Sequence, residues 1–485
     1  MIWDFKPYPN MKHSGAPWLG EVPDHWEIKR LGQMGRFLKG CGGNKDDEEA
    51  SGVPCIRYGD LYTTHTYFVV KSRSFVSTSI AQSYTPIRFG DVLFAASGET
   101  IEEIGKSAVN LIQSEACCSG DTIVFRSALA LESRFMGYAT DCRAAVAQKA
   151  SMGRGITIKH IYGDQLKYLT LALPPLPEQR AIARFLDHAD QRIRRYIRAR
   201  QKLIKLLDEQ KQAIIEGAIT RGLDPDVRLK PSGVNWLGEV PHHWVVASLR
   251  FHYHQCLGKM VDAKRVSGTR LLPYLRNLDV RWDRINTANL PQIDVAPEQL
   301  ERYTLRVGDL LVCEGRHLGR AAFWRGELPI CAFQKALHRL RPRKRTRDAP
   351  RYLFYCLYVV HFKDAFGASS DDNSIPHLTG EMLRAHKFPF PPLEEQESIA
   401  AHLDDRIATL DRARAVIESE ISRVREYRSR LIADIVTGKV DVRETAARLP
   451  DVSAEPERPE EDVASREVEM ERDEGLEYQI AEVDQ

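Results

Sequence analysis

The feature that most constrains this chain is an internal duplication. Residues 14–26 read SGAPWLGEVPDHW, and residues 232–244, which start 218 positions later, read SGVNWLGEVPHHW. A second block, PPLPEQRAIARFLD at residues 174–187, returns 217 positions later as PPLEEQESIAAHLD at residues 391–404. Solenoid repeats have periods of about 20–50 residues, so copies this long are duplicated domains. The chain therefore follows one plan twice.

Between these blocks the two copies diverge in sequence but keep a common skeleton. Its matched parts are Arg57-x-x-Asp60 with Arg276-x-x-Asp279, residues 89–94 (FGDVLF) with 307–312 (VGDLLV), and Gly105-Lys106 with Gly319-Arg320. Each copy is thus a variable domain of roughly 150 residues, a common domain size, followed by a constant segment. The boundaries that we predict are 1–175 and 223–392 for the variable domains, 176–222 and 393–438 for the constant segments, and 444–485 for a separate tail.

The constant segments are predicted to be long helices. Each begins with two prolines and a Glu-Gln pair, which suit the first turn of a helix, and each ends near a glycine, Gly222 or Gly438. Apolar residues then recur every seven positions, and because 217 is a multiple of seven both stripes have the same phase. The stripe residues are Leu186, Ile193, Leu207 and Ile214 in the first segment and Leu403, Leu410, Ile417, Val424 and Leu431 in the second. Two readings stay open: two amphipathic helices that each lie on their own domain, or a coiled coil of the two. We favour the coiled coil, because each stripe is longer than a small domain can cover.

Charge is distributed unevenly, although the formal net charge is only +2. Residues 451–485 contain 14 acidic and 3 basic residues, a net charge of −11, so residues 1–450 carry +13. A basic body favours a polyanionic partner, although many enzymes are equally basic. The tail has few apolar residues, which predicts disorder. We interpret it as a solvated tail; the alternatives are a mimic of phosphate charge and a docking peptide.

The sequence carries no sign of export or of a membrane partner. No apolar run approaches the roughly 20 residues that span a bilayer, and residues 1–15 have no basic region followed by an apolar stretch. The nine cysteines form no C-x-x-C pair, and an odd number without a signal suggests reduced thiols. We therefore expect a cytoplasmic protein.

A search for catalytic motifs finds none. Gly105-Lys106-Ser107 ends like a phosphate-binding loop, but the glycine that this loop needs five positions earlier is replaced by Thr100. G-x-S-x-G, H-E-x-x-H and paired Cys/His motifs are missing, as are a glycine-rich cofactor loop and the Asn/Asp-Pro-Pro-aromatic signature of amino-methyltransferases. We therefore expect no catalytic residue, metal ligand or cofactor site in this chain.

Basic, aromatic and hydroxyl side chains are better candidates for function, as contacts to DNA. Arginine and asparagine pair bidentately with guanine and adenine edges, and lysine and arginine contact phosphates. Residues 339–347 (RLRPRKRTR) hold six basic residues, and residues 192–200 hold five arginines. A solvated loop and a solvated helix face are equally good interpretations of these two runs. The candidate DNA contacts are Arg57, Tyr58, Tyr62, Thr63, Thr64, His65, Lys106, Arg154, Arg276, Asn277, Arg281, Trp282, Arg316, Arg320, Arg343, Lys344 and Arg345.

Four motifs together resemble those of type I restriction–modification specificity subunits. They are the WLGEVP-x-HW box, the PPLPEQ-x-x-IA-x-x-LD helix start, and the joints at residues 219–230 (ITRGLDPDVRLK) and 436–443 (VTGKVDVR). The resemblance extends to about Arg443 and does not include the acidic tail. It implies an α+β fold in which two mixed α/β target-recognition domains are separated by two long helices. These helices would form an antiparallel coiled coil with pseudo-twofold symmetry.

The resemblance also implies a role. Each target-recognition domain would read one half of a bipartite, asymmetric site in double-stranded DNA, and the helices would set the length of the unread spacer. Two modification (methyltransferase) subunits and two restriction (ATP-dependent translocase and nuclease) subunits would dock on the chain. S-adenosylmethionine, ATP and Mg would bind to those partners, and this chain would not be an enzyme. The alternatives are the recognition half of another multi-subunit restriction or methyltransferase system, a self-contained DNA enzyme, and a coiled-coil scaffold that binds only protein.

Overall fold

The computed structural model describes residues 5–98, 100–101, 104–153, 159–260, 270–315, 317–366 and 377–450. The chain divides into two units: residues up to 201 together with the stretch from 418 onward form the first, and residues 202–417 form the second. Each unit holds one α/β domain and part of both long helices, α7 (Leu176–Arg221, 46 residues) and α11 (Leu393–Val436, 44 residues).

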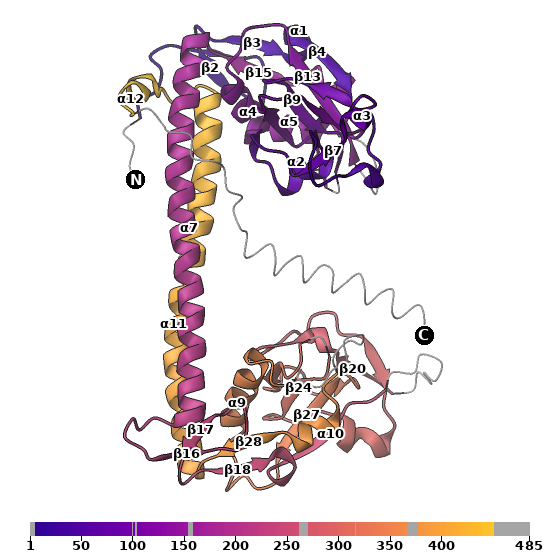
Figure 1. The fold of residues 1–485 in the computed structure, drawn as a ribbon, viewed down its shortest axis with the longest axis vertical. Helices are drawn as coiled ribbons and strands as arrows, with labels where there is room; N and C mark the ends of the chain where they lie inside the picture. The colour runs from indigo at the N-terminus through magenta and orange to yellow at the C-terminus, as the bar shows by residue number, and fades with distance from the viewer. Residues whose placement is uncertain are drawn as a thin grey trace. The chain divides into compact units, whose positions relative to one another are not determined.

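The α/β domain of the first unit is built on two small sheets. Its elements are β1 (Met11–His13), β2 (Glu21–Pro23), β3 (Glu27–Arg30), α1 (Leu31–Met34), β4 (Gly35–Lys39), η1 (Lys45–Asp47), β5 (Val53–Ile56), α2 (Tyr58–Thr63), β6 (Tyr67–Val69), β7 (Ser74–Val76), α3 (Thr78–Ala81), β8 (Thr85–Ile87), β9 (Val92–Ala95), β10 (Ser97–Gly98), β11 (Ser107–Asn110), β12 (Ala116–Cys118), β13 (Thr122–Ser127), α4 (Ser133–Asp141), α5 (Arg143–Met152), β14 (Lys159–His160), α6 (Gly163–Leu166) and β15 (Thr170–Leu173). A five-stranded sheet has the order β4-β13-β9-β11-β6, and a four-stranded sheet has the order β7-β5-β12-β8. The β11–β6 and β12–β5 pairs are parallel, and the other pairs in these two sheets are antiparallel. Helix α4 packs against β11 and β6. Figure 1 shows this helix in the same domain as β9 and β13.

The central strands of this domain separate two cores. Along β9, Val92 and Phe94 belong to the core that includes α4, whereas Leu93 and Ala95 belong to a core shared with the four-stranded sheet. This alternation follows from the two-residue period of a strand. Because both faces are covered, β9 is apolar throughout (VLFA) and all four of its residues are buried.

The second unit repeats this layered arrangement. Its elements are β16 (Leu229–Pro231), β17 (Glu239–Pro241), β18 (Val245–Ser248), η2 (Leu249–Phe251), β19 (Tyr253–Leu257), β20 (Leu271–Leu275), η4 (Asn277–Asp279), β21 (Val280–Arg281), β22 (Arg284–Ile285), β23 (Gln292–Asp294), η5 (Pro297–Gln299), α8 (Leu300–Tyr303), β24 (Leu310–Cys313), β25 (Ala321–Phe323), β26 (Ala332–Phe333), β27 (Leu337–Pro342), α9 (Pro350–Phe362), α10 (Gly380–Ala385) and β28 (Lys387–Phe390). The main sheet has the order β19-β27-β24-β25, and a three-stranded sheet has the order β23-β20-β26. Along β24, Leu310 and Val312 face the core that includes α9, whereas Leu311 and Cys313 face a second core.

The long helices predicted from the heptad stripes are present, and side chains join them within each unit. In the first unit the guanidinium of Arg428 in α11 pairs with Asp190 in α7. In the second, Lys211 Nζ lies 2.8 Å from Asp411 Oδ1, and Arg414 Nη1 lies 3.1 Å from Asp208 Oδ1. In the second unit the later residue of α7, Lys211, pairs with the earlier residue of α11, Asp411. The two helices therefore run in opposite directions there. Of the stripe residues, the buried ones are Leu186, Ile193, Leu403, Ile417 and Leu431, and the partly buried ones are Leu207, Ile214, Leu410 and Val424.

The start of segment 444–485, which we predicted to be a disordered tail, is folded. Arg443–Ala447 form a short helix, α12, and Ala446 is buried in the core of the first unit. The apolar surface of this last turn is therefore covered, which corrects the boundary. The rest of the acidic tail, residues 451–485, lies outside the described residues. In the part of the chain that the structure describes, no helix combines the length and apolar character needed to cross a bilayer.

Candidate functional site

The first repeated block binds the second through a buried carboxylate. Glu178, in the first turn of α7, accepts hydrogen bonds from the Trp26 indole Nε1 (3.1 Å), the His25 Nε2 (2.8 Å) and the Tyr8 hydroxyl (2.6 Å). Burial raises the pKa of Tyr8, and the hydrogen bond to Glu178 raises it further, so the hydroxyl stays a donor. The tryptophan box thus fixes the domain to the start of its helix.

The second copy has the same anchor. Glu395, in the first turn of α11, accepts from the Trp244 Nε1 at 3.0 Å and from the His243 Nε2 at 2.7 Å. The glutamine that follows each glutamate also has one role in both copies. Gln179 donates to the Pro174 carbonyl, and Gln396 donates to the Pro391 carbonyl, both at 2.8 Å.

A third matched contact joins each domain to its helix. The Tyr138 hydroxyl and Arg134 Nη1 in α4 bind Asp187 of α7, at 2.9 and 3.3 Å. In the second copy, α9 binds Asp404 of α11 through the same residue types, Arg351 Nε at 2.8 Å and the Tyr355 hydroxyl at 2.5 Å. These partners are not among the residues that we predicted from the sequence. The signal is an Arg-x-x-x-Tyr pattern that recurs at the separation of 217 residues.

The Arg-x-x-Asp motif that the two variable domains share forms hydrogen bonds within each domain. The backbone N–H of Arg57 donates to the Asp60 carboxylate at 3.1 Å, and that of Arg276 donates to Asp279 at 2.8 Å. Each aspartate is the third residue of a short helix and accepts from the backbone N–H of the arginine that caps the start of that helix. The Arg-x-x-Asp repeat is therefore explained by local folding.

The Gly-Asp turns are explained in the same way. Asp91 pairs with Arg126 Nη2 at 2.6 Å, and Asp309 pairs with Arg341 Nε at 2.5 Å. Both carboxylates are almost fully buried and bind a guanidinium from the neighbouring strand, in the bidentate geometry that arginine favours.

In the first domain several candidate DNA contacts are engaged internally. The Arg57 guanidinium lies 3.4 Å from Glu48 Oε2, and the Tyr62 hydroxyl donates to the Ser97 carbonyl at 2.7 Å. His65 is buried, and this burial lowers its pKa. The burial of His65 argues against its direct contact with a base.

Lys106 belongs to a buried ionic cluster. Its Nζ lies 2.5 Å from Asp141 Oδ2, and the fully buried Lys149 Nζ lies 3.1 Å from Asp141 Oδ1 and 2.7 Å from the Gly105 carbonyl. Burial alone would raise the pKa of Asp141, but the two ammonium groups outweigh it and lower the pKa. The Gly-Lys pair therefore ties the start of β11 to the α4–α5 turn.

The second domain buries some of its candidates as well. Arg320 is buried and donates through Nη2 to the carbonyl of Asn277 at 3.1 Å, and the Asn277 side chain is itself buried. Arg276 binds Asp279 through its guanidinium. Trp282 packs edge-on against Tyr358 of α9, with ring centroids 5.0 Å apart.

Other candidates are accessible. The exposed ones are Tyr58, Thr63, Arg281, Arg343, Lys344 and Arg345, and Thr64 is half-buried. Arg154 and Arg316 lie outside the described residues. The exposed basic run 343–345 precedes α9, and Arg343 Nε donates to the Arg250 carbonyl at 2.8 Å. The loop is exposed, and this fits both interpretations that the sequence left open, a solvated loop and a contact to phosphates.

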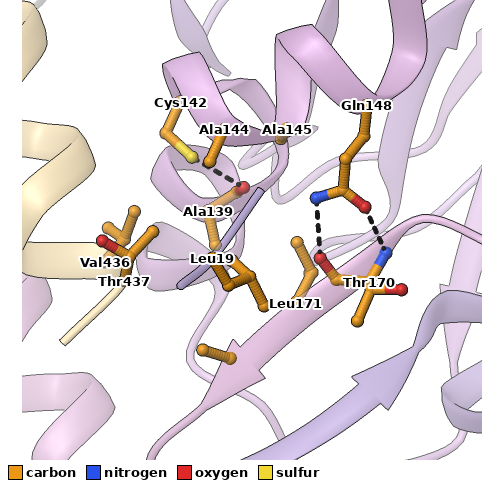
Figure 2. A pocket seen from close by; sticks show the side chains of 11 residues that line it. Leu19, Ala139, Cys142, Ala144, Ala145, Gln148, Thr170, Leu171, Val436 and Thr437 are labelled. Atoms are coloured by element: carbon orange, nitrogen blue, oxygen red, sulfur yellow. Dashed lines mark hydrogen bonds between the residues drawn. The ribbon is translucent and has the colours of Figure 1, made fainter. Parts of the chain in front are cut away.

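Two cavities of the first unit differ in what they offer. A cavity of about 10 Å³ lies among Ala139, Leu171 and Val436, with room for about one water (Figure 2). The amide of Gln148 at its side both donates to and accepts from the backbone of Thr170, at 3.0 Å each, so these groups are already paired. This cavity is a small packing gap and not a ligand site.

The second cavity is an open groove of about 740 Å³ along the edge strand β4, beside β14 and α6. Arg36, Lys39 and Lys167 line it, together with Tyr162, which is 59% exposed. Basic and aromatic side chains around a groove suit a nucleic-acid surface better than a small acidic ligand site. Among the described residues, no group of three or more His, Cys, Asp or Glu side chains is placed to hold a metal ion.

Comparison with known proteins identifies the family. The profile described as "Type I restriction modification DNA specificity domain" matches residues 23–205 and 274–422, which together make up more than half of the chain. The chain belongs to this family. Each matched segment includes most of one α/β domain and continues into the long helix that its tryptophan box anchors, so the two α/β domains are DNA-recognition domains.

Relatives of this specificity family match along most of the chain. The "Type I restriction enzyme MjaVIII specificity subunit" of Methanocaldococcus jannaschii is 21% identical over 440 residues, which cover 87% of this chain and 94% of that protein. The "Type I restriction enzyme EcoKI specificity subunit" of Escherichia coli K12 is 21% identical over 437 residues, covering 87% and 90%.

A solved structure has the same fold. It is described as the structural basis of complex assembly and conformational transition of the type I R-M system, and it matches 86% of this chain and 98% of its own with a TM-score of 0.64 at 18% identity. The family match and the named relatives make this chain a specificity subunit of type I restriction–modification systems.

Proposed function

We propose that the chain recognises a bipartite, asymmetric site in double-stranded DNA, with each α/β domain reading one half. The observation that carries the proposal is the matched pair of anchors. Glu178 and Glu395 fix two different variable domains to two equivalent helix starts. Two different α/β domains that are held on equivalent helix starts predict two different half-sites.

The two long helices act as the spacer in this proposal. At 1.5 Å per residue, α7 is about 69 Å long, whereas one turn of DNA is roughly 34–36 Å. We propose that α7 and α11 pair as an antiparallel coiled coil. The ion pairs of both units and the burial of both stripes support this.

In this proposal the catalytic reactions are carried out by partner subunits. Two modification subunits dock on the chain and form a methyltransferase that uses S-adenosylmethionine, and two restriction subunits add an ATP- and Mg-dependent translocase and nuclease. This chain then supplies sequence specificity and no catalytic residue. The predicted cytoplasmic location belongs to the same proposal.

Genome-wide methylation mapping tests this function. Cells that hold the modification subunits are compared with and without this chain. We expect one bipartite motif to become methylated only when the chain is present. Methyl transfer or cleavage by the purified chain alone would instead show a self-contained DNA enzyme and refute the proposal.

A further inference from the structure

A chain of three side chains in the second unit ends on an exposed arginine. His338 on β27 is fully buried, and its Nε2 lies 2.7 Å from the carbonyl of Leu378. Its Nδ1 lies 2.6 Å from Gln255 Nε2 on β19. The other amide atom, Gln255 Oε1, accepts from Arg384 Nη1 at 2.8 Å. Three elements that are far apart in the sequence therefore meet at this point.

The donor and the acceptor of each of these three hydrogen bonds can be assigned. The Leu378 carbonyl can only accept, so His338 Nε2 carries the proton and Nδ1 accepts from the amide of Gln255. Burial lowers the pKa of His338, which keeps the ring neutral at physiological pH. The amide oxygen must then face Arg384, where it accepts from Nη1 of the guanidinium.

Arg384 is exposed, and no carboxylate of the described residues forms an ion pair with it. Its guanidinium has five N–H donors, so donors remain for a ligand. Arg384 is an exposed arginine bound to a half-buried glutamine, which is bound in turn to a buried histidine. It differs from an arginine that pairs with a buried carboxylate of its own fold, such as Arg341 with Asp309.

The basic loop 343–345 adjoins the same surface. Arg343 Nε donates to the carbonyl of Arg250 in η2, and the N–H of Leu249, also in η2, donates to the carbonyl of His386 directly after α10, at 3.0 Å. Phosphate contacts by this loop would bring the DNA toward α10.

In the first unit the glycine 217 positions earlier, Gly163, also begins a short helix, α6, but it lies against a different side chain. A side-chain carbon built at Gly380 would meet Gln255 Nε2 at 2.7 Å, and one built at Gly163 would meet Phe37 Cβ at 3.3 Å. The matched position therefore carries an amide in one copy and a phenyl ring in the other. In the first unit this place is the open groove of about 740 Å³. Two domains that share a frame but read different sequences need such a difference.

We propose that Arg384 reads a guanine in the half-site of the second domain, and that Gln255 and His338 are its positioning residues. Arginine bound bidentately to guanine O6 and N7 is the commonest base-specific contact in the major groove. This inference rests on the proposed function, since it assumes that the second domain reads one half-site.

The test uses the full chain assembled with its modification subunits. The complex methylates a DNA library that is randomised at both half-sites, and the methylated products are sequenced. For Arg384→Ala we expect discrimination at one G·C position of the second half-site to fall roughly 5- to 150-fold, with the first half-site unchanged. Arg384→Lys keeps the positive charge but loses the paired N–H donors that bind guanine bidentately. Discrimination should therefore fall at the same position.

Two further variants separate positioning from folding. Gln255→Leu removes the hydrogen bond to Arg384 and should weaken discrimination at that same position. It also leaves the buried His338 Nδ1 without a donor, so a lower melting temperature is expected, and the selection is made at a temperature at which this variant is folded. Lys167→Ala, at the matched place in the first unit, should leave the second half-site unaltered.

The outcomes separate the two proposals. If the wild-type complex selects no bipartite sequence, the proposed function fails and this inference fails with it. If the wild type selects two half-sites and Arg384→Ala selects the same two, only this inference is overturned. A loss spread over all positions, or a loss at an A·T position, also overturns it.

Discussion

Replacement of Glu178 with alanine tests how the first recognition domain is held on its helix. The carboxylate is 6% exposed and accepts from the hydroxyl of Tyr8 and the indole of Trp26, which are both buried. A buried donor left without its acceptor costs about 1–3 kcal/mol. Glu178→Ala should therefore destabilise the first unit by about 2–6 kcal/mol.

The duplication supplies a matched control. Glu395 is 30% exposed and has one buried donor, Trp244, because His243 is half-exposed and can donate to water instead. Glu395→Ala should therefore cost the second unit only about 1–3 kcal/mol. Glu178→Gln, which keeps one acceptor oxygen, should lie between the wild type and Glu178→Ala.

Hydrogen–deuterium exchange with mass spectrometry on the full chain measures both effects in the same sample. The free energy of opening is read from peptides of β3 and the start of α7 for the first unit, and from β18 and the start of α11 for the second. Equal losses in the two alanine variants would refute the reasoning. An unchanged opening free energy in the first unit of Glu178→Ala would refute it as well.

Three further predictions concern stability. Gly438→Ala should destabilise the first unit far more than Gly222→Ala destabilises the second, measured by thermal melting, because both have positive φ but only the former places Cβ 2.2 Å from Pro23 Cδ. Burial lowers the pKa of His386 from 6.5 to about 4, so protonation favours the unfolded chain, and stability present above pH 6.5 should fall by up to about 3 kcal/mol as the pH drops to 4. In urea unfolding of a His386→Phe variant the fall in stability between pH 6.5 and 4 should be smaller by this amount, since other buried histidines such as His65 and His338 keep their own contributions; an equal fall would contradict the assignment. Lys149→Met should cost about 3–5 kcal/mol by urea unfolding, since the buried aspartate that it neutralises loses a partner, and a cost below 1 kcal/mol would contradict this.

The sequence alone predicts the repeated plan of the fold well, because the plan depends on local patterns. Proline and Glu-Gln signals place the helix starts, and α7 and α11 begin at Leu176 and Leu393, as predicted to within a residue. The glycines at 222 and 438 follow the helix ends, Arg221 and Val436, within two residues.

Contacts between distant segments are harder to predict. The tryptophan box and Glu178 are both visible as repeats, but their hydrogen bonds join residues 152 apart in the chain. A repeat shows that two positions are constrained, and it does not show that they touch. The structure supplies that link, and it also shows that Arg57 and Arg276 keep their spacing to an aspartate because they begin a helix.

The candidate readers of DNA were the least predictable part. Gln255, His338 and Arg384 lie on three elements, so no local pattern joins them. The repeat matches Arg384 only with another basic residue, Lys167, which does not mark it as a reader of bases. Residues that read DNA bases are expected to differ between the two copies. The internal repeat, which revealed the anchors and the long helices, therefore cannot reveal them.

One measurement tests the central claim, that two readers are held apart by the paired helices. One heptad is inserted at the middle of both α7 and α11, which keeps the phase of the stripes and adds about 10.5 Å, the length of roughly three base pairs. Methylation mapping with this variant should show the same two half-sites separated by a spacer about three base pairs longer. Altered half-sites, or the original spacer, would contradict the account.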